Sequence, residues 1–188
     1  DGVAVTGYEL LLPDDSGSGS SSGTAVPAGT PVEVWVGDDG YLAQIAMAPG
    51  GDALAVWTRS DGINEFVQAA RYSATSGTWA APRTLSAGSV FTEYAVVAVG
   101  PTGNGVAVWY RLGVAEAARY DAAGDTWTAA ETLSSGAING PPALAADAEG
   151  NAIAAWQMSS SGVLEVARFA ADATAWTTSV VPGSTAVS

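Results

Sequence analysis

The sequence contains no cysteine, no histidine and no lysine, and these absences narrow the chemistry open to it. Without a thiol or an imidazole, the chain cannot use Ser-His-Asp or Cys-His catalysis, bind a metal through thiolate or imidazole ligands, or form a disulfide. No other catalytic constellation stands out among its residues. We therefore expect a protein that is not an enzyme and that needs no cofactor.

Positive charge is also scarce. Six arginines stand against nineteen acidic residues, which gives a net charge of −13, and only 13% of the residues are charged. Proteins that bind nucleic acids neutralise phosphates with basic side chains, so we expect no nucleic-acid partner. A neutral glycan or another protein chain fits this charge better.

Long apolar runs are missing as well. No stretch reaches the roughly 18 apolar residues that a membrane-spanning helix needs, so we expect no membrane insertion. The sequence starts at Asp1 rather than at Met, and we expect a targeting segment to have been removed. These features predict a secreted or cell-surface protein whose acidity keeps it in solution.

What the sequence does contain is a threefold repeat, in which equivalent arginines are 48 and 49 residues apart. Each copy contains a seven-residue motif that runs from Gly to Trp, an Arg-aromatic pair follows, and a second Trp stands seven residues after the aromatic. The first motif covers residues 51–57, 103–109 and 150–156; the pairs are Arg71-Tyr72, Arg119-Tyr120 and Arg168-Phe169; the second tryptophans are Trp79, Trp127 and Trp176.

Each repeat is expected to form four short antiparallel strands, because turn residues recur every 8–12 positions and no segment has helical periodicity. In the first repeat these strands cover residues 43–48, the Gly-to-Trp motif, the segment that ends in Arg71-Tyr72, and residues 79–85. The aligned alanines Ala55, Ala107 and Ala154 fit strands packed tightly between neighbouring repeats. The predicted organisation is an N-terminal β segment with a Gly/Ser-rich loop at 1–40, and a domain at 41–188 made of repeats 41–90, 91–138 and 139–188.

The repeated charged residues are the candidate ligand-binding side chains. Three arginines and two glutamates, each three residues before an arginine, recur at equivalent positions: Arg71, Glu116, Arg119, Glu165 and Arg168. An odd offset places Arg and acid on opposite faces of a strand, so within one repeat they are not expected to meet. The structural alternative is an ion pair or a guanidinium stacked on a neighbouring Trp.

Acidic turns raise one metal hypothesis. Calcium prefers several oxygen ligands on a turn, and Asp38-Asp39 and residues 147–151 offer such oxygens. Neither segment matches an EF-hand loop, and plain turns are the alternative. We expect no metal centre that the fold requires.

The period, the four-strand pattern and the sequences Gly77-Thr78-Trp79 and Gly124-Asp125-Thr126-Trp127 resemble the Asp-box (BNR) repeats of sialidase-like β-propellers. The resemblance covers residues 41–185 and implies an all-β fold of propeller-like blades. The Phe/Tyr-Arg-Ile-Pro motif of sialidases is absent, so the resemblance implies a non-catalytic relative. A β-trefoil, which closes with three repeats, is the alternative fold.

Three blades do not close a propeller, which typically has four to eight. We therefore expect a homo-oligomer or a part of a larger chain. The predicted function is an extracellular binding or adhesion module directed at carbohydrate. The alternatives are a structural subunit of a cell-surface assembly or filament, completed by strand addition between chains, and a fragment of a sialidase-like glycosidase.

Overall fold

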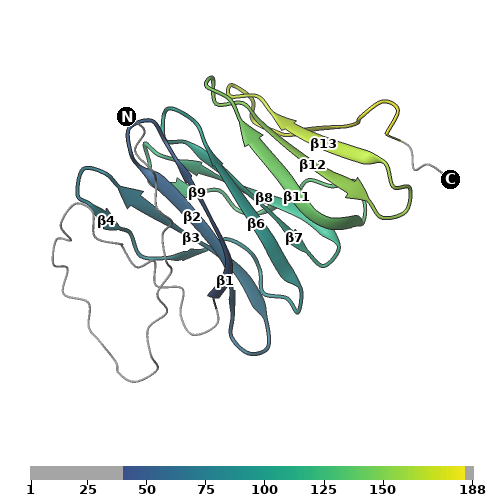
Figure 1. Cartoon of the computed structure of the whole chain (residues 1–188), viewed down its shortest axis with the longest axis horizontal. Coiled ribbons are helices and arrows are strands. Elements are labelled where there is room, and N and C mark those ends of the chain that lie inside the picture. The colour runs from purple at the N-terminus through teal and green to yellow at the C-terminus, as the bar shows by residue number, and fades with distance from the viewer. Residues whose placement is uncertain (1–39, 185–188) are drawn as a thin grey trace, which may run out of the picture.

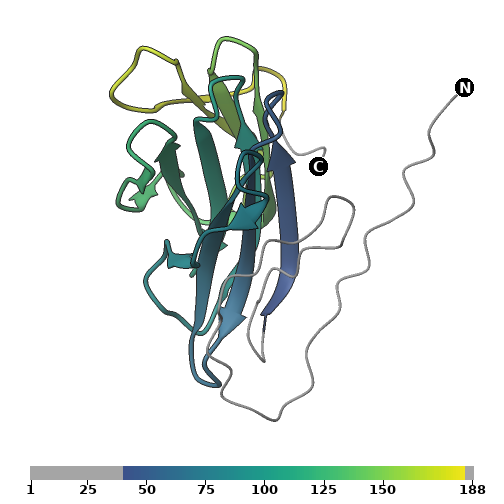
Figure 2. The same ribbon diagram turned by 90° about the vertical axis from the view of Figure 1, so that its left-hand side faces the viewer.

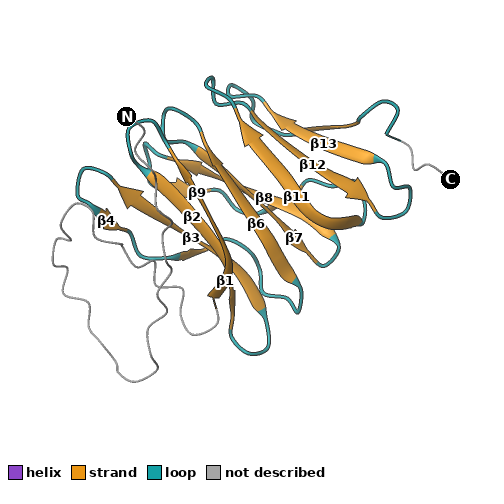
Figure 3. Cartoon of the chain, in the orientation of Figure 1, coloured by secondary structure: helices purple, strands orange, loops and turns teal. Residues whose placement is uncertain are grey.

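The computed structural model describes residues 40–184, which form β-strands and loops and no helix (Figures 1 and 3). The strands make three antiparallel sheets, one for each repeat. Sheet A holds β1 (Gly40–Met47), β2 (Ala53–Ser60), β3 (Glu65–Ser73), β4 (Thr78–Trp79) and β5 (Arg83–Thr84). Sheet B holds β6 (Thr92–Val99), β7 (Gly105–Arg111), β8 (Val114–Asp121), β9 (Thr126–Trp127) and β10 (Glu131–Thr132). Sheet C holds β11 (Ile138–Ala146), β12 (Ala152–Met158), β13 (Leu164–Phe169) and β14 (Thr177–Val180).

The three sheets are arranged side by side as blades, with their long strands running in similar directions (Figures 1 and 2). The first strand of each sheet lies on the inner side of the fan, where β6 contacts both β1 and β11. The predicted propeller-like blades are confirmed. The trefoil alternative is wrong for the described residues, because the repeats pair their strands only within their own sheets.

Each sheet has two apolar faces, which we call forward (toward the next repeat) and rear (toward the preceding one). Alternation along β2 places Leu54 and Val56 on the forward face and Trp57 on the rear face. One buried cluster joins Val56 of sheet A to Trp109 of sheet B. A second joins Val108 of sheet B to Trp156 of sheet C. The forward face of one sheet is therefore covered by the Trp-bearing rear face of the next.

Small and large side chains share each rear face. Ala107 and Ala154 are fully buried, as the sequence pattern predicted, and stand two residues before Trp109 and Trp156 on the same face. An alanine lets the backbones of adjacent sheets approach, while the indole fills the wider space nearby. The repeated Ala-x-Trp pattern is thus the packing unit between sheets.

The predicted fourth strand is continuous only in sheet C. In sheet A, Tyr72 pairs with Trp79, but the pairing then shifts by one residue so that Ala69 lies opposite Arg83. Sheet B has the same extra residue, whereas β14 keeps one register along its length. The cause is a bulge, which leaves one residue unpaired and splits the strand.

The predictions for residues 1–39 lie outside the described residues, as does the Asp38-Asp39 turn. Among the residues that the structure describes, no helix is long and apolar enough to cross a membrane.

The contact between sheets predicts a large cost for removing a central indole. Trp109→Ala should lower the free energy of unfolding by about 3–5 kcal/mol, because the cavity left between sheets A and B cannot collapse fully. Trp176→Ala is the matched control, since Trp176 is only half-buried, and it should cost clearly less. Urea denaturation measures both, and equal losses would contradict this packing.

Candidate functional site

The two predicted glutamates are buried and serve the fold. Glu116 lies opposite Trp109 across the β7–β8 ladder and accepts a hydrogen bond of 3.1 Å from its indole Nε1. Arg111 donates two further bonds to the same carboxylate, of 2.9 and 2.6 Å. With these donors in place, the Glu116 carboxylate has a structural role.

Glu165 has the equivalent place in sheet C. Its carboxylate accepts hydrogen bonds from Trp156 Nε1 at 2.9 Å, from the Ser135 amide at 3.0 Å and from Ser135 Oγ at 2.5 Å. Burial raises the pKa of Glu165, but these three donors outweigh it, so the pKa lies below its ordinary value. Because Ser135 belongs to the segment that leads into sheet C, Glu165 also ties that segment to β13.

Sheet A lacks this carboxylate. Gln68 lies opposite Trp57, and its amide donates instead to Thr84 Oγ1 at 3.1 Å. The buried Trp57 Nε1 has no hydrogen-bond partner. Only the second and third repeats therefore satisfy the central indole with an acid.

The three predicted arginines lie on forward faces, apart from the glutamates. Arg71 is at the contact of sheets A and B, and Arg119 is at the contact of sheets B and C. Arg168 is exposed on the forward face of sheet C. The structure therefore does not bring the five predicted residues together into one site.

One place does gather polar and aromatic side chains at the surface, and we call it the A–B seam. It lies between the outer strands of sheets A and B. Its main residues are Asp52, Arg71, Arg83, Tyr120, Asp125 and Trp127.

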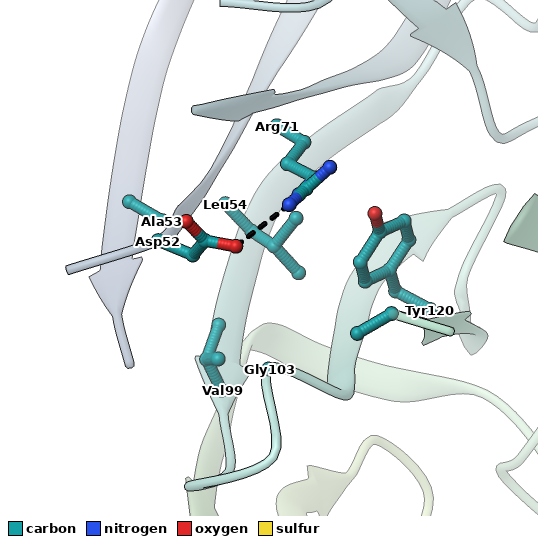
Figure 4. A pocket seen from close by; sticks show the side chains of 8 residues that line it. Asp52, Ala53, Leu54, Arg71, Val99, Gly103 and Tyr120 are labelled. Atoms are coloured by element: carbon teal, nitrogen blue, oxygen red, sulfur yellow. Dashed lines mark hydrogen bonds and ion pairs between the residues drawn. The ribbon is translucent and has the colours of Figure 1, made fainter. Parts of the chain in front are cut away.

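The sheet A side of the seam is organised by an ion pair. Arg71 donates from its guanidinium to Asp52 Oδ2 at 2.7 Å, and the amide of Ala74 donates to Asp52 Oδ1 at 2.9 Å. Figure 4 shows Arg71 reaching Asp52, with Tyr120 of sheet B opposite. The Arg71 hydrogen bond holds the pKa of Asp52 below its ordinary value, so the pair stays charged at neutral pH.

The sheet B side of the seam is built on an aromatic pair. The rings of Tyr120 and Trp127 lie 5.2 Å apart between centroids, at 47°. The Tyr120 hydroxyl donates to Asp125 Oδ1 at 2.5 Å. Burial, followed by the bond to Asp125, raises the pKa of Tyr120, so the phenol remains neutral.

Size and charge limit what the seam can accept. Two adjoining hollows each have a cavity volume of about 10 Å³, which is room for about one water molecule and far below the roughly 300–1,000 Å³ of a pocket for a drug-sized ligand. Two arginines face two aspartates, so the formal charges balance. A ligand would therefore have to lie across the surface of the seam, where the polar side chains suit a neutral group whose hydroxyls both donate and accept hydrogen bonds.

The equivalent place between sheets B and C is filled. Asn104 replaces Asp52 there, and it accepts from the Ala122 amide at 2.9 Å but carries no charge to hold Arg119. The Arg119 guanidinium instead lies over the ring of Phe169, with Cζ 4.3 Å from the centroid. Glu131 forms a longer ion pair with Arg119 Nε, at 3.8 Å. The guanidinium is therefore stacked, as the structural alternative expected, but on Phe169 and not on a tryptophan.

The sequence-based candidates included Arg71 but missed the other seam residues. Asp125 and Trp127 were visible in the Gly-Asp-Thr-Trp motif, and Asp52 in the recurring Gly-Asp/Asn step. Nothing in the sequence signalled that Asp52 and Tyr120 lie on either side of Arg71, because that depends on how the sheets stack.

The second calcium hypothesis concerns Asp147. Its Oδ1 accepts from the amides of Glu149 and Asn151, at 3.0 and 2.9 Å, and Oδ2 accepts from the Asn151 side chain at 2.7 Å. The Asn151 bond is the main reason that the pKa of Asp147 is lowered. Within residues 40–184 no group of three or more acidic side chains could hold a metal ion.

Comparisons with known proteins bear on the fold. No protein-family model and no curated protein matches the sequence. Among solved structures, the chain is similar to "Hadza microbial sialidase Hz136", with a TM-score of 0.51 and 13% sequence identity. The match covers 73% of this chain and 36% of that one, so the chain spans little more than a third of its structural neighbour. At this identity the likeness shows a sialidase-like β fold and nothing finer.

The environment of Glu165 predicts a pH-dependent contribution to stability. Its pKa is lowered in the folded protein, so its stabilising effect is complete above the ordinary value of 4.5 and is lost as the pH falls through the lower folded value. At pH 7, Glu165→Gln should cost about 1–3 kcal/mol of unfolding free energy. The difference from the wild type should shrink toward pH 3.

Glu149→Gln is the control for this experiment, because Glu149 is exposed on a turn. Thermal unfolding across the pH range compares the three proteins. A constant difference between wild type and Glu165→Gln from pH 7 to pH 3 would show that the carboxylate contributes nothing through its charge.

Proposed function

We propose that the protein is a non-catalytic extracellular binding module that takes a neutral carbohydrate at the A–B seam. The observation that carries the proposal is the pairing of a balanced set of charges with an aromatic surface. Arg71 and Asp52 are locked together, Tyr120 and Asp125 are locked together, and Trp127 lies beside them. Sugars offer hydroxyls to such fixed charges and apolar ring faces to tryptophan.

The hollows are too small to enclose a sugar, so we expect a glycan to lie across the surface of the seam and to contact it through one or two of its sugar units. Each hollow is shallow, so single-site affinity is expected to be weak. The likeness to a sialidase supports a carbohydrate-related fold for the chain as a whole.

Two other functions were predicted from the sequence. A structural subunit of a cell-surface assembly is favoured by the apolar forward face of sheet C, where Ile153 and Leu164 are exposed. A glycosidase fragment has less support, because both acids of the seam are engaged, Asp52 by Arg71 and Asp125 by Tyr120.

The carbohydrate proposal predicts a specific loss of binding. Arg83 is exposed in the seam and has no ion-pair partner among the described residues, so Arg83→Ala should remove a donor without disturbing the fold. We expect glycan binding, measured by NMR titration against a panel of neutral oligosaccharides, to weaken about tenfold.

Arg59→Ala is the matched control, because Arg59 is exposed on β2 and does not line the seam. It should bind as the wild type does. Absence of any chemical-shift change in the wild type at millimolar sugar would overturn the proposal.

A further inference from the structure

The forward face of sheet C repeats a residue pattern that sheets A and B bury. In each sheet one cross-strand pair joins a branched aliphatic side chain to the repeated arginine: Leu54–Arg71, Val106–Arg119 and Ile153–Arg168. The neighbouring pair on the same face always combines one valine with one alanine: Val56–Ala69, Val108–Ala117 and Ala155–Val166. In sheet C the two residues have changed places, so the pair keeps its volume.

In sheet C this pattern lies open. Leu54 and Val106 are 1% and 8% exposed under the next sheet, whereas Ile153 is 46% exposed. Val67 and Ala115 are fully buried, whereas the equivalent Leu164 is 37% exposed. Sheet C forms one end of the fan in Figure 1, and no described strand covers its forward face. A contiguous apolar face bordered by a cation marks an interaction surface.

The other end of the fan offers a matching partner. At each contact between sheets, an arginine meets the aromatic that follows the next repeated arginine: Arg71 lines one hollow with Tyr120, and Arg119 lies over Phe169. Within residues 40–184 this series leaves Arg168 without an aromatic at one end and Tyr72 without an arginine at the other.

Tyr72 packs against the second tryptophan of its repeat, as Tyr120 and Phe169 do. Its ring lies 5.4 Å from that of Trp79 at 53°, close to the geometry of Phe169 with Trp176. Tyr72 is only half-buried, whereas Tyr120 and Phe169 are buried by the arginine side of the preceding sheet. Trp57, Ala55 and Ala70 of this face are already buried within one copy, so a partner would meet only its outer part, at Tyr72 and Trp79.

We propose that the forward face of sheet C docks on the outer part of the rear face of sheet A, at Tyr72 and Trp79, in a second copy of the chain, with Arg168 over Tyr72 of that copy. The contact joins two different surfaces, so it is head-to-tail and produces a closed ring or an open chain. It leaves the A–B seam free and does not depend on carbohydrate binding. Because each copy carries a net charge of −13, salt should strengthen the association by screening repulsion.

Analytical ultracentrifugation of the 18.7 kDa chain tests whether copies associate. The wild type should form dimers or longer assemblies as concentration and salt increase. Ile153→Asp places a charge on the docking face and should weaken association at least tenfold. Ile63→Asp makes the same change at an exposed turn and should leave association as in the wild type. Thermal unfolding checks that both variants fold.

A wild type that stays monomeric at millimolar concentration in high salt would overturn the proposal. So would an Ile153→Asp variant that folds and associates normally.

Cross-linking tests the head-to-tail orientation. Because the chain has no native cysteine, only the introduced cysteines can react. Arg168→Cys and Tyr72→Cys variants, mixed and treated with a short bismaleimide, should give a cross-linked pair that neither variant gives alone. Thr102→Cys, at an exposed turn, should cross-link with neither. Cross-linking of Arg168→Cys to itself at the rate of the mixture would mean a face-to-face contact and would overturn the proposed orientation.

Discussion

The structure depends on one constraint: a sheet with two apolar faces must be covered twice. Each repeat supplies branched aliphatic side chains on one face and an Ala-x-Trp pattern on the other, so neighbouring sheets bury each other. A single sheet with two apolar faces would leave this surface in contact with water. The fold is therefore stabilised by contacts between repeats as much as by contacts within them. At each end of the described fan, one sheet face has no neighbouring repeat stacked on it.

The same constraint explains why the two contacts between sheets differ in function. Both have an arginine from one sheet and an aromatic from the next. With Asp52 present, the arginine is held back and the seam stays hollow; with Asn104 instead, the arginine lies on the ring and fills the space. The Tyr120 hydroxyl and Asp125 add polar groups that Phe169 cannot supply. A change of one charge in a repeated frame thus separates a candidate binding site from a packing contact.

Much of the fold could be predicted from sequence, because its signals are local. The spacing of Arg71, Arg119 and Arg168 revealed the repeats, and the alternation around Trp57, Trp109 and Trp156 revealed the strands. The role of Glu116 could not be predicted, because it follows from the strand register that sets it opposite Trp109. The A–B seam was hidden for a similar reason, since Asp52 and Tyr120 meet only when two sheets stack. The bulges in sheets A and B left a trace in the sequence, as one extra residue between Trp79 and Leu85 relative to the third repeat.

Facing sheets are coupled through the branched side chains of one and the tryptophan of the next. A double-mutant cycle on Val108→Ala and Trp156→Phe measures this coupling directly, because both side chains lie in the cluster between sheets B and C. We expect the loss of unfolding free energy in the double variant to differ from the sum of the two single losses by about 0.5 kcal/mol or more. Strict additivity would mean that the two sheets do not share a core, and it would contradict this coupling.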